Sequence, residues 1–385
     1  MNAIKNPFKT PQGHFNLGRY PLHKKETLRA WDAADEYLLE HLDAQDNTVD
    51  NESRILIVND SFGALAIALH KFKPDVQLDS YLAEQGLINN FNLNNIELNN
   101  VVLLNSMAPL IGHYDLVIIK VPKSHAYLED ILYKIQPHIS PQSKIIAAAM
   151  AKNIHSSTLK LFEKIIGETT TSLAKKKARL IFSSFTTNKI MESPYPKQFE
   201  LEIESNTLTI ANHANVFSRE KLDIGTRFLL ENMPRPKPYK TIVDLGCGNG
   251  LLGLVAAKQN PEAKIVFTDE SYMAVASAKT NFENAFSSSH AATFLVTDCL
   301  AGVEEQSVDL ILCNPPFHQN HVVGDHIAWQ MFNEAYAALE PGGEFWIVGN
   351  HHLAYHSKLK KIFGGYDVVA SNKKFAIMLS RKTKT

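Results

Sequence analysis

The stretch that decides the fold is Ile242-Val-Asp-Leu-Gly-Cys-Gly-Asn-Gly250. Its first residues are apolar and predict a buried strand, and the apolar residues 251–258 after it predict a helix. Glycine at positions 246, 248 and 250 lets the turn adopt positive φ and approach a ligand closely, while the helix N-terminus faces that ligand. A strand, a glycine-rich turn and a helix in this order predict an α/β domain with a cofactor site.

The glycines of this turn also fit a second class of enzyme. Gly248, Gly250 and Gly253 satisfy the GxGxxG spacing of dinucleotide-binding domains, and that fingerprint alone is a weak signal. Asp269, which ends the next apolar run, would hold a ribose in either class. The residues after the third and fourth strands therefore have to discriminate between the two classes.

Polar residues do follow the third and fourth predicted strands. Asp298 ends one apolar run, where a carboxylate can accept a hydrogen bond from an adenine amino group, and Asn314-Pro-Pro-Phe317 ends the next. Two consecutive prolines terminate a strand and leave a rigid loop. The Asn314 amide, the Pro315 carbonyl and the Phe317 ring can accept the hydrogens of an exocyclic amine and stack on the ring that carries it. Acids after three strands and NPPF after the fourth are typical of S-adenosylmethionine (SAM) methyltransferases, whereas nicotinamide enzymes have no use for that loop.

The first half of the chain repeats the second half in a diverged form. Residues 54–74 align with residues 241–261 at a constant offset of 187, and residues 115–122 echo residues 309–316 at an offset of 194. At the positions of Gly246, Gly248 and Asn314, the first copy has Asn59, Ser61 and Lys120. The first copy is therefore predicted to keep its sheet and to have lost its ligand chemistry.

This duplication predicts the domain organisation. At 385 residues the chain exceeds the size at which one core stops growing, so two tandem methyltransferase-like (Rossmann-like) α/β domains are expected. Residues 1–195 would form the degenerate domain and residues 196–385 the catalytic one. A strand at 344–348 and a hairpin at 368–379 predict an antiparallel pair at the end of the second sheet, which makes it a seven-stranded mixed sheet.

Three shorter segments add expectations. Residues 26–42 have apolar side chains near helical spacing, with Trp31 expected in the core. Residues 199–210 alternate and predict a hairpin. Ser218 and Asp223 are candidate helix caps ahead of the second sheet.

The charge and the cysteine content limit which partners and which cellular compartment can be expected. The net charge is −1, but residues 26–115 are acidic and residues 116–200 are basic, and the cluster Lys175, Lys176, Lys177 and Arg179 could either meet RNA phosphates or form a solvated turn. Three cysteines without CxxC spacing argue against disulfides and a zinc site, so no metal is expected. The N-terminus lacks a signal-peptide core and no run is long enough to span a membrane. We therefore expect a cytoplasmic protein.

Together these residues resemble the bacterial ribosomal RNA guanine-N2 methyltransferases of the RsmC/RlmG family, and within it the large-subunit (23S) type. The shared segments are DLGCGNG, TDES, CNPPFHQ, NVFSREKLDIGT, RYPL and AWDAADEYLL, which cover nearly the whole chain. The resemblance implies that SAM donates a methyl group to N2 of a guanine in 23S ribosomal RNA, and that the first domain helps to hold the RNA.

The resemblance also implies a set of site residues. The residues expected to bind SAM are Asp244, Gly246, Gly248, Gly250, Asp269, Asp298 and Asn314. Asn314, Pro315 and Phe317 would hold the target base, and His318 would assist proton removal, bind phosphate or have a purely structural role. Three alternatives stay open at this point: a small-subunit (16S) guanine-N2 methyltransferase, an N6-adenine or glutamine methyltransferase with the same loop, and an inactive RNA-binding module.

Overall fold

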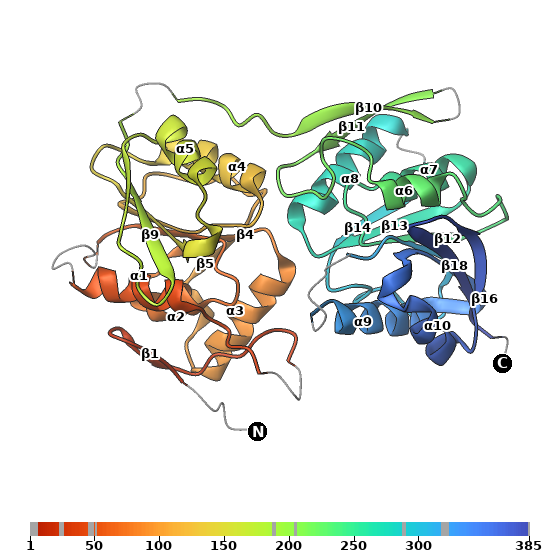
Figure 1. Ribbon diagram of the computed structural model, residues 1–385, viewed down its shortest axis with the longest axis horizontal. Coiled ribbons are helices and arrows are strands. Elements are labelled where there is room, and N and C mark those ends of the chain that lie inside the picture. Colours follow the sequence, from red (N-terminus) through yellow and green to blue (C-terminus); the bar gives the residue numbers. More distant parts are fainter. Residues whose placement is uncertain are drawn as a thin grey trace. The chain divides into compact units, whose positions relative to one another are not determined.

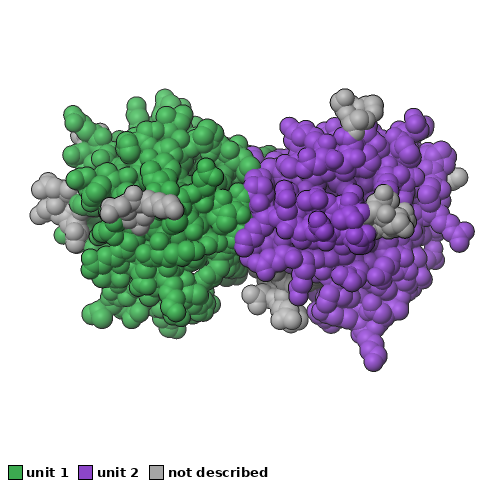
Figure 2. Space-filling view, turned by 90° about the horizontal axis from the view of Figure 1, so that it is seen from above, with its two compact units in different colours: residues 1–195 green, residues 196–385 purple. Residues whose placement is uncertain are grey.

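The computed structural model describes residues 7–22, 27–44, 50, 52–186, 190–203, 206–286, 290–316 and 323–383. The chain divides into two compact units, Met1–Tyr195 and Pro196–Thr385, which Figure 2 colours separately. Each unit contains a seven-stranded sheet. The predicted fold class, two tandem methyltransferase-like α/β domains, is confirmed. Among the helices of the described residues, none is long and apolar enough to cross a membrane.

The sheet of the second unit has the strand order β14-β13-β12-β15-β16-β18-β17. Its strands are β12 (Thr241–Leu245), β13 (Lys264–Asp269), β14 (Ala292–Val296), β15 (Val308–Cys313), β16 (Leu339–Asn350), β17 (Asp367–Ser371) and β18 (Phe375–Arg381). The first five in the order pair in parallel, β18 pairs antiparallel with β16, and β17 pairs antiparallel with β18. The antiparallel pair predicted at the end of the sheet is therefore present.

Helices cover both faces of this sheet. The helices α6 (Ile224–Leu230), α7 (Leu251–Gln259) and α8 (Tyr272–Ala285) lie on one face, and α9 (Val323–Ala338) and α10 (Tyr355–Phe363) lie on the other (Figure 1). Successive residues of β12 serve the two cores in turn, since Ile242 packs with α7 and α8 whereas Val243 packs with α9 and α10. Burial on both faces explains why the central strands are continuous apolar runs. The predicted hairpin is also present, as β10 (Lys197–Ile203) and β11 (Asn206–Asn212).

The sheet of the first unit has the matching order β5-β4-β3-β6-β7-β9-β8. Its strands are β3 (Ile55–Val58), β4 (Asp75–Leu78), β5 (Val102–Asn105), β6 (Leu116–Lys120), β7 (Lys144–Met150), β8 (Thr169–Thr171) and β9 (Ala178–Ser183), and a separate hairpin joins β1 (Phe8–Thr10) to β2 (Gly13–Phe15). The helices are α1 (Ala33–Ala44), α2 (Ala64–Ala68) and α3 (Tyr81–Leu93) on one face and α4 (His125–Ile135) and α5 (Ser156–Ile165) on the other (Figure 1).

Helix α1 begins later than the sequence predicted. Glu26 lies outside the described residues, but residues 27–32 are not helical, so the first part of the helix predicted for residues 26–42 is wrong. A reciprocal cap fixes the first turn further along: Asp32 Oδ1 accepts from the Ala34 N–H at 2.8 Å, and Asp35 Oδ2 accepts from the Asp32 N–H at 2.8 Å. Capping of this kind satisfies N–H groups that have no partner within the helix. Trp31, just before the cap, is buried as predicted.

The helix that follows the central strand, α7 after β12 and α2 after β3, packs against the sheet with different pairs of side chains in the two units. In the second unit Gly253 of α7 faces the buried ring of Phe267. The register places Val76 of β4 at the position of Phe267, and the helix position of Gly253 is taken by Ala66 of α2. A large strand residue with a glycine, and a small strand residue with an alanine, fill the same space in two ways.

Gly253→Ala should therefore destabilise the second unit, although alanine is the better helix former. The added Cβ would lie well inside van der Waals contact with Phe267, and such overpacking costs about 1–3 kcal/mol, against roughly 1 kcal/mol gained in helix propensity. Thermal unfolding of the full chain measures the effect. The double variant Gly253→Ala/Phe267→Val should lose less than the sum of its two single changes, and strict additivity would contradict this account of the contact.

Candidate active site and cofactor site

The predicted site residues meet at the carboxyl edge of the second sheet. From β12 the chain passes to β13 on one side and later to β15 on the other, so the loops that follow β12 and β15 diverge. Ligands of open α/β sheets bind in the crevice at such a switch point. The residues at these strand ends are Asp244 and Gly246 at β12, Asp269 at β13, Asp298 after β14 and Asn314 after β15.

The glycine turn combines tight packing behind with open space in front. Gly246, Gly248 and Gly250 have φ values of 70°, 55° and 79°, in the left-handed region that favours glycine. A Cβ on Gly250 would overlap Ala278 of α8, whereas a Cβ on Gly248 would meet nothing within 4 Å. Gly250 is thus required by packing, and Gly248 leaves room in which a ligand can approach the backbone.

Asp244 anchors this turn from beneath. Its side chain is almost fully buried, and Oδ2 accepts from the Gly253 N–H at 2.8 Å, which ties the start of α7 to β12. Oδ1 is buried and has no hydrogen-bond partner among the described residues. Burial raises the pKa of Asp244 to about 8, opposed by the Gly253 N–H and reinforced by the charge of Asp269.

Asp269 and Asp298 end neighbouring strands. Asp269 accepts from the Gly248 N–H at 2.9 Å and from the Ser271 N–H at 3.0 Å, so its carboxylate stands beside the glycine turn. The Thr297 N–H donates to the Asp269 carbonyl at 2.9 Å, which brings the half-buried Asp298 next to it in the row. Two carboxylates in this row are acceptors suited to a ribose hydroxyl and an adenine amino group.

Asn314 has a defined orientation. Its Nδ2 donates to Thr226 Oγ1 at 2.8 Å and to Asp223 Oδ2 at 3.2 Å, while its Oδ1 is buried and accepts no hydrogen bond within the described part of the chain. Asp223 caps α6 as predicted, accepting from the Thr226 N–H at 2.9 Å. Its second contact, to Asn314, was not predicted. Ser218 lies in a turn with φ 56° and starts no helix, so its predicted role as a cap is wrong.

The structure describes some of the remaining predicted site residues and not others. Phe317 and His318 lie outside the described residues, so their roles stay predictions. In the basic cluster, Lys176 pairs with Glu36 at 2.8 Å and Lys175 pairs with Glu40. Lys177 and Arg179 have no ion-pair partner among the described residues.

The first unit has replaced the polar strand ends. Strand register places its residues at the positions of Gly246, Asp269, Asp298 and Asn314; they are Asn59, Leu78, Met107 and Lys120. Leu78 is buried and has no acceptor to offer a ribose. The acids that distinguish the second unit are absent from the first at these positions.

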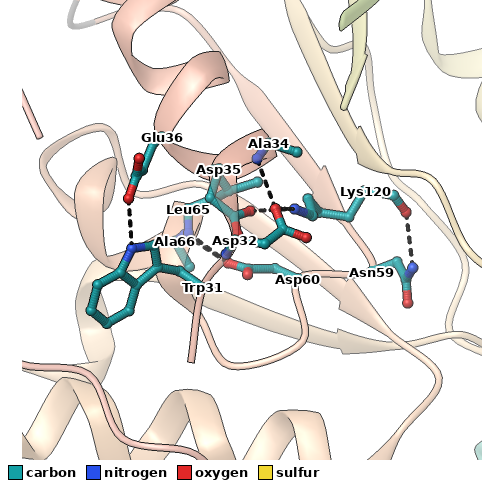
Figure 3. Close-up of polar contacts among 10 residues, drawn as sticks. All are labelled: Trp31, Asp32, Ala34, Asp35, Glu36, Asn59, Asp60, Leu65, Ala66 and Lys120. Carbon is teal, nitrogen blue, oxygen red and sulfur yellow. Dashed lines mark hydrogen bonds and ion pairs between the residues drawn. The ribbon is translucent and has the colours of Figure 1, made fainter. Parts of the chain in front are cut away.

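An ion pair occupies this edge of the first sheet (Figure 3). Lys120 Nζ lies 2.6 Å from Asp35 Oδ1 and 3.1 Å from Asp32 Oδ1. Burial opposes the charge of Lys120, but the two carboxylates outweigh it and hold its pKa above the usual value. Asp60 does here what Asp244 does in the second unit, accepting from the N–H groups of Leu65 and Ala66 at 2.9 Å. Burial, with Asp35 adding to it, raises the pKa of Asp60 to about 7.

Two methyltransferase-like sheets, with an intact row of polar strand ends on the second, define a SAM-dependent methyltransferase with tandem domains. Residues 5–187 match the family "RLMG N-terminal domain" and residues 207–379 match "Methyltransferase small domain". The chain is 47% identical over 372 residues to the ribosomal RNA large subunit methyltransferase G of Klebsiella pneumoniae (strain 342), covering 96% of each. It is 46% identical to the protein of the same name from Pseudomonas putida (strain W619), covering 97% of this chain and 99% of the relative.

The chain belongs to the ribosomal RNA large subunit methyltransferase G family, which confirms the resemblance seen in the motifs. A similar solved structure is the T. thermophilus 16S rRNA N2 G1207 methyltransferase (RsmC) in complex with AdoMet and guanosine. It superposes with a TM-score of 0.77 at 20% identity, covering 98% of this chain and 97% of that one. At that identity the likeness supports the tandem fold.

SAM titrated calorimetrically into the full chain should bind at one site. Asp269→Ala should weaken this binding about tenfold or more, because a buried ribose contact would lose its acceptor. Met107→Ala, at the strand end of the first unit that corresponds to Asp298, is a control and should leave the affinity unchanged. A stoichiometry of two, or an unchanged affinity in Asp269→Ala, would contradict the assignment.

Proposed function

We propose that this protein transfers the methyl group of SAM to the exocyclic N2 of a guanine in 23S ribosomal RNA. The observation that carries the chemistry is the buried Asn314 Oδ1, an acceptor without a partner in the described structure, at the carboxyl end of β15 beside β12. Family membership supplies the class of RNA. Asp244 and Gly250, which were predicted to bind SAM, hold the glycine turn in this proposal.

The cofactor site would be formed by the glycine turn and the two acids beside it. Gly248 leaves space for a ligand against the backbone, Asp269 would accept from the ribose hydroxyls, and Asp298 would accept from the adenine amino group. When bound, SAM supplies an electrophilic methyl group on a positively charged sulfur. Asp244 would hold the turn in place through α7.

The strand-end loop would prepare the target amine. The lone pair of guanine N2 is delocalised into the ring, so the amine is a poor nucleophile. Asn314 Oδ1 and the Pro315 carbonyl would each accept one N2 hydrogen and turn the lone pair toward the methyl group. Holding this geometry is worth several of the ~7–11 kcal/mol available to positioning. Phe317 would stack on a base that has left its helix, at ~1–3 kcal/mol, and His318 would assist proton removal or bind phosphate.

Other N–H donors would satisfy the same acceptors. Adenine N6 and a glutamine amide present equivalent hydrogens, so the geometry alone does not choose among them. Membership of the large-subunit family favours guanine N2 in 23S RNA over these and over a 16S substrate. The intact row from Asp244 to Asn314 argues against an inactive RNA-binding module.

A deletion strain tests both substrate and mechanism. Nucleoside mass spectrometry of its 23S RNA should show one N2-methylguanosine missing, restored by the wild-type gene. Asn314→Ala should bind SAM within about threefold of wild type and fail to restore the nucleoside, because the Asn314 contact matters most in the transition state. Restoration by Asn314→Ala would contradict the mechanism, and loss of N6-methyladenosine or of a 16S modification would contradict the substrate.

The first unit would contribute to RNA binding, and the protein would work in the cytoplasm. Its basic cluster begins just before β9, and Lys177 is exposed. Lys175 and Lys176 form ion pairs with acidic neighbours, so Lys177 and Arg179 are more available to bind RNA phosphates.

The free cysteines fit a reducing compartment, in agreement with the proposed cytoplasmic location.

Replacing all four basic residues should weaken RNA binding and flatten its dependence on salt, because fewer counterions are released. Lys177→Gln/Arg179→Gln should lower the magnitude of the log–log slope by about 1–2, and Lys175→Gln/Lys176→Gln should change it less. Filter binding from low to moderate salt gives both slopes. If the variant with all four residues replaced has the wild-type slope, the cluster is a solvated turn that makes no phosphate contacts.

A further inference from the structure

Both units contain the same contact between a helix start and a strand end. In the second unit Asn314, which follows β15, contacts Asp223 just before α6 and Thr226, the third residue of α6. In the first unit Lys120, at the end of β6, contacts Asp32 just before α1 and Asp35, the third residue of α1. Register already places Lys120 at the position of Asn314.

The sequence around these helices carries the correspondence. Leu222-Asp-Ile-Gly-Thr-Arg-Phe-Leu-Leu230 aligns without a gap with Trp31-Asp-Ala-Ala-Asp-Glu-Tyr-Leu-Leu39. The capping aspartate is the same in both copies. The third helical residue differs together with the strand end, an acid facing a lysine in one copy and a threonine facing an asparagine in the other. The helix start therefore matches the chemical character of the strand-end side chain.

In the second unit the contact fixes which end of the Asn314 amide faces outward. A carboxylate only accepts hydrogen bonds, and Asp223 Oδ2 accepts from the Thr226 N–H at 2.9 Å and from the Thr226 hydroxyl at 3.4 Å. That hydroxyl has one hydrogen, so its lone pairs face Asn314. The amide must present its NH2 group to both neighbours, and its Oδ1 points the other way.

We propose that Asp223 and Thr226 are positioning residues that fix the Asn314 amide with Oδ1 as the acceptor for the substrate amine. The inference rests on the proposed function and assigns these two residues a part in it. With the amide reversed, NH2 would face the N–H groups of the target and repel them. The orientation of the Asn314 amide thus selects a substrate that donates hydrogen bonds, and the protein itself fixes this orientation.

Variants can separate this role from helix capping. Thr226→Val keeps the shape and the backbone N–H but removes the hydroxyl, and Thr226→Ser restores it. Asp223→Ser keeps a capping oxygen but is too short to reach Asn314. Single-turnover methylation of 23S RNA by the full chain should fall about 10- to 100-fold in Thr226→Val and Asp223→Ser, with SAM and RNA affinities within about twofold of wild type. Thr226→Ser should stay within about threefold of the wild-type rate.

A double-mutant cycle distinguishes positioning from a structural effect. In the Asn314→Ala background, adding Thr226→Val should change the remaining rate by less than about twofold, because the side chain to be positioned is gone. An equal loss in both backgrounds, or a Thr226→Val enzyme as fast as Thr226→Ser, would overturn the proposal.

A second measurement does not depend on the substrate. The side-chain amide protons of Asn314, assigned by NMR from their absence in Asn314→Ala, should exchange with solvent at least about ten times faster in Thr226→Val than in wild type. Unchanged exchange would overturn the proposal even if the enzyme modifies another nucleotide. A wild-type enzyme that fails to methylate guanine N2 would instead overturn the proposed function and leave this result standing.

Discussion

The central constraint in the second unit is the parallel pairing of β12 with strands on both sides. Because β13 and β15 flank it, the loops that follow β12 and β15 diverge at the carboxyl edge, which is where open α/β sheets bind their ligands. The hydrogen bond from the Gly253 N–H to Asp244 fixes the first loop to α7, and the two prolines after Asn314 end β15 and restrict the second loop. The row of strand-end carboxylates and the single amide all depend on this pairing.

The first unit shows the same fold with the polar strand ends replaced. It retains the strand order, the left-handed glycine before α2, and a buried carboxylate that holds that helix, although Asp60 supplies it from a different position than Asp244. Leu78 has removed the acceptor at the second strand. At this edge the charges of Lys120 and Asp35 pair with each other. Removing one partner of such a buried pair would cost about 3–5 kcal/mol, because the other charge would be left buried and unpaired. The first unit therefore has paired charges at the edge where the second unit has an unpaired acceptor.

At the corresponding position of the second unit, Asn314 keeps a buried acceptor without a partner among the described residues. An unpaired buried acceptor costs about 1–3 kcal/mol, and it persists because Asn314 is held between the buried Cys313 and Pro315 and by α6. Local rules are commonly broken at functional sites and compensated elsewhere. Here the compensation is the well-packed sheet, in which Ile311 and Leu312 of β15 are fully buried on opposite faces.

The sequence by itself determined the duplication, the sheet class, the order of acids and NPPF, and the degenerate character of the first copy, because these follow from local apolar runs and from glycines and prolines whose backbone preferences are strong. It misplaced the start of α1 by several residues, since a reciprocal cap between Asp32 and Asp35 overrode the helical spacing of the side chains before it. It treated Asp223 as a cap only. That Asp223 and Thr226 orient Asn314 was decided by the tertiary structure, because the contact joins residues about ninety positions apart, and no local preference specifies which helix start will meet which strand end.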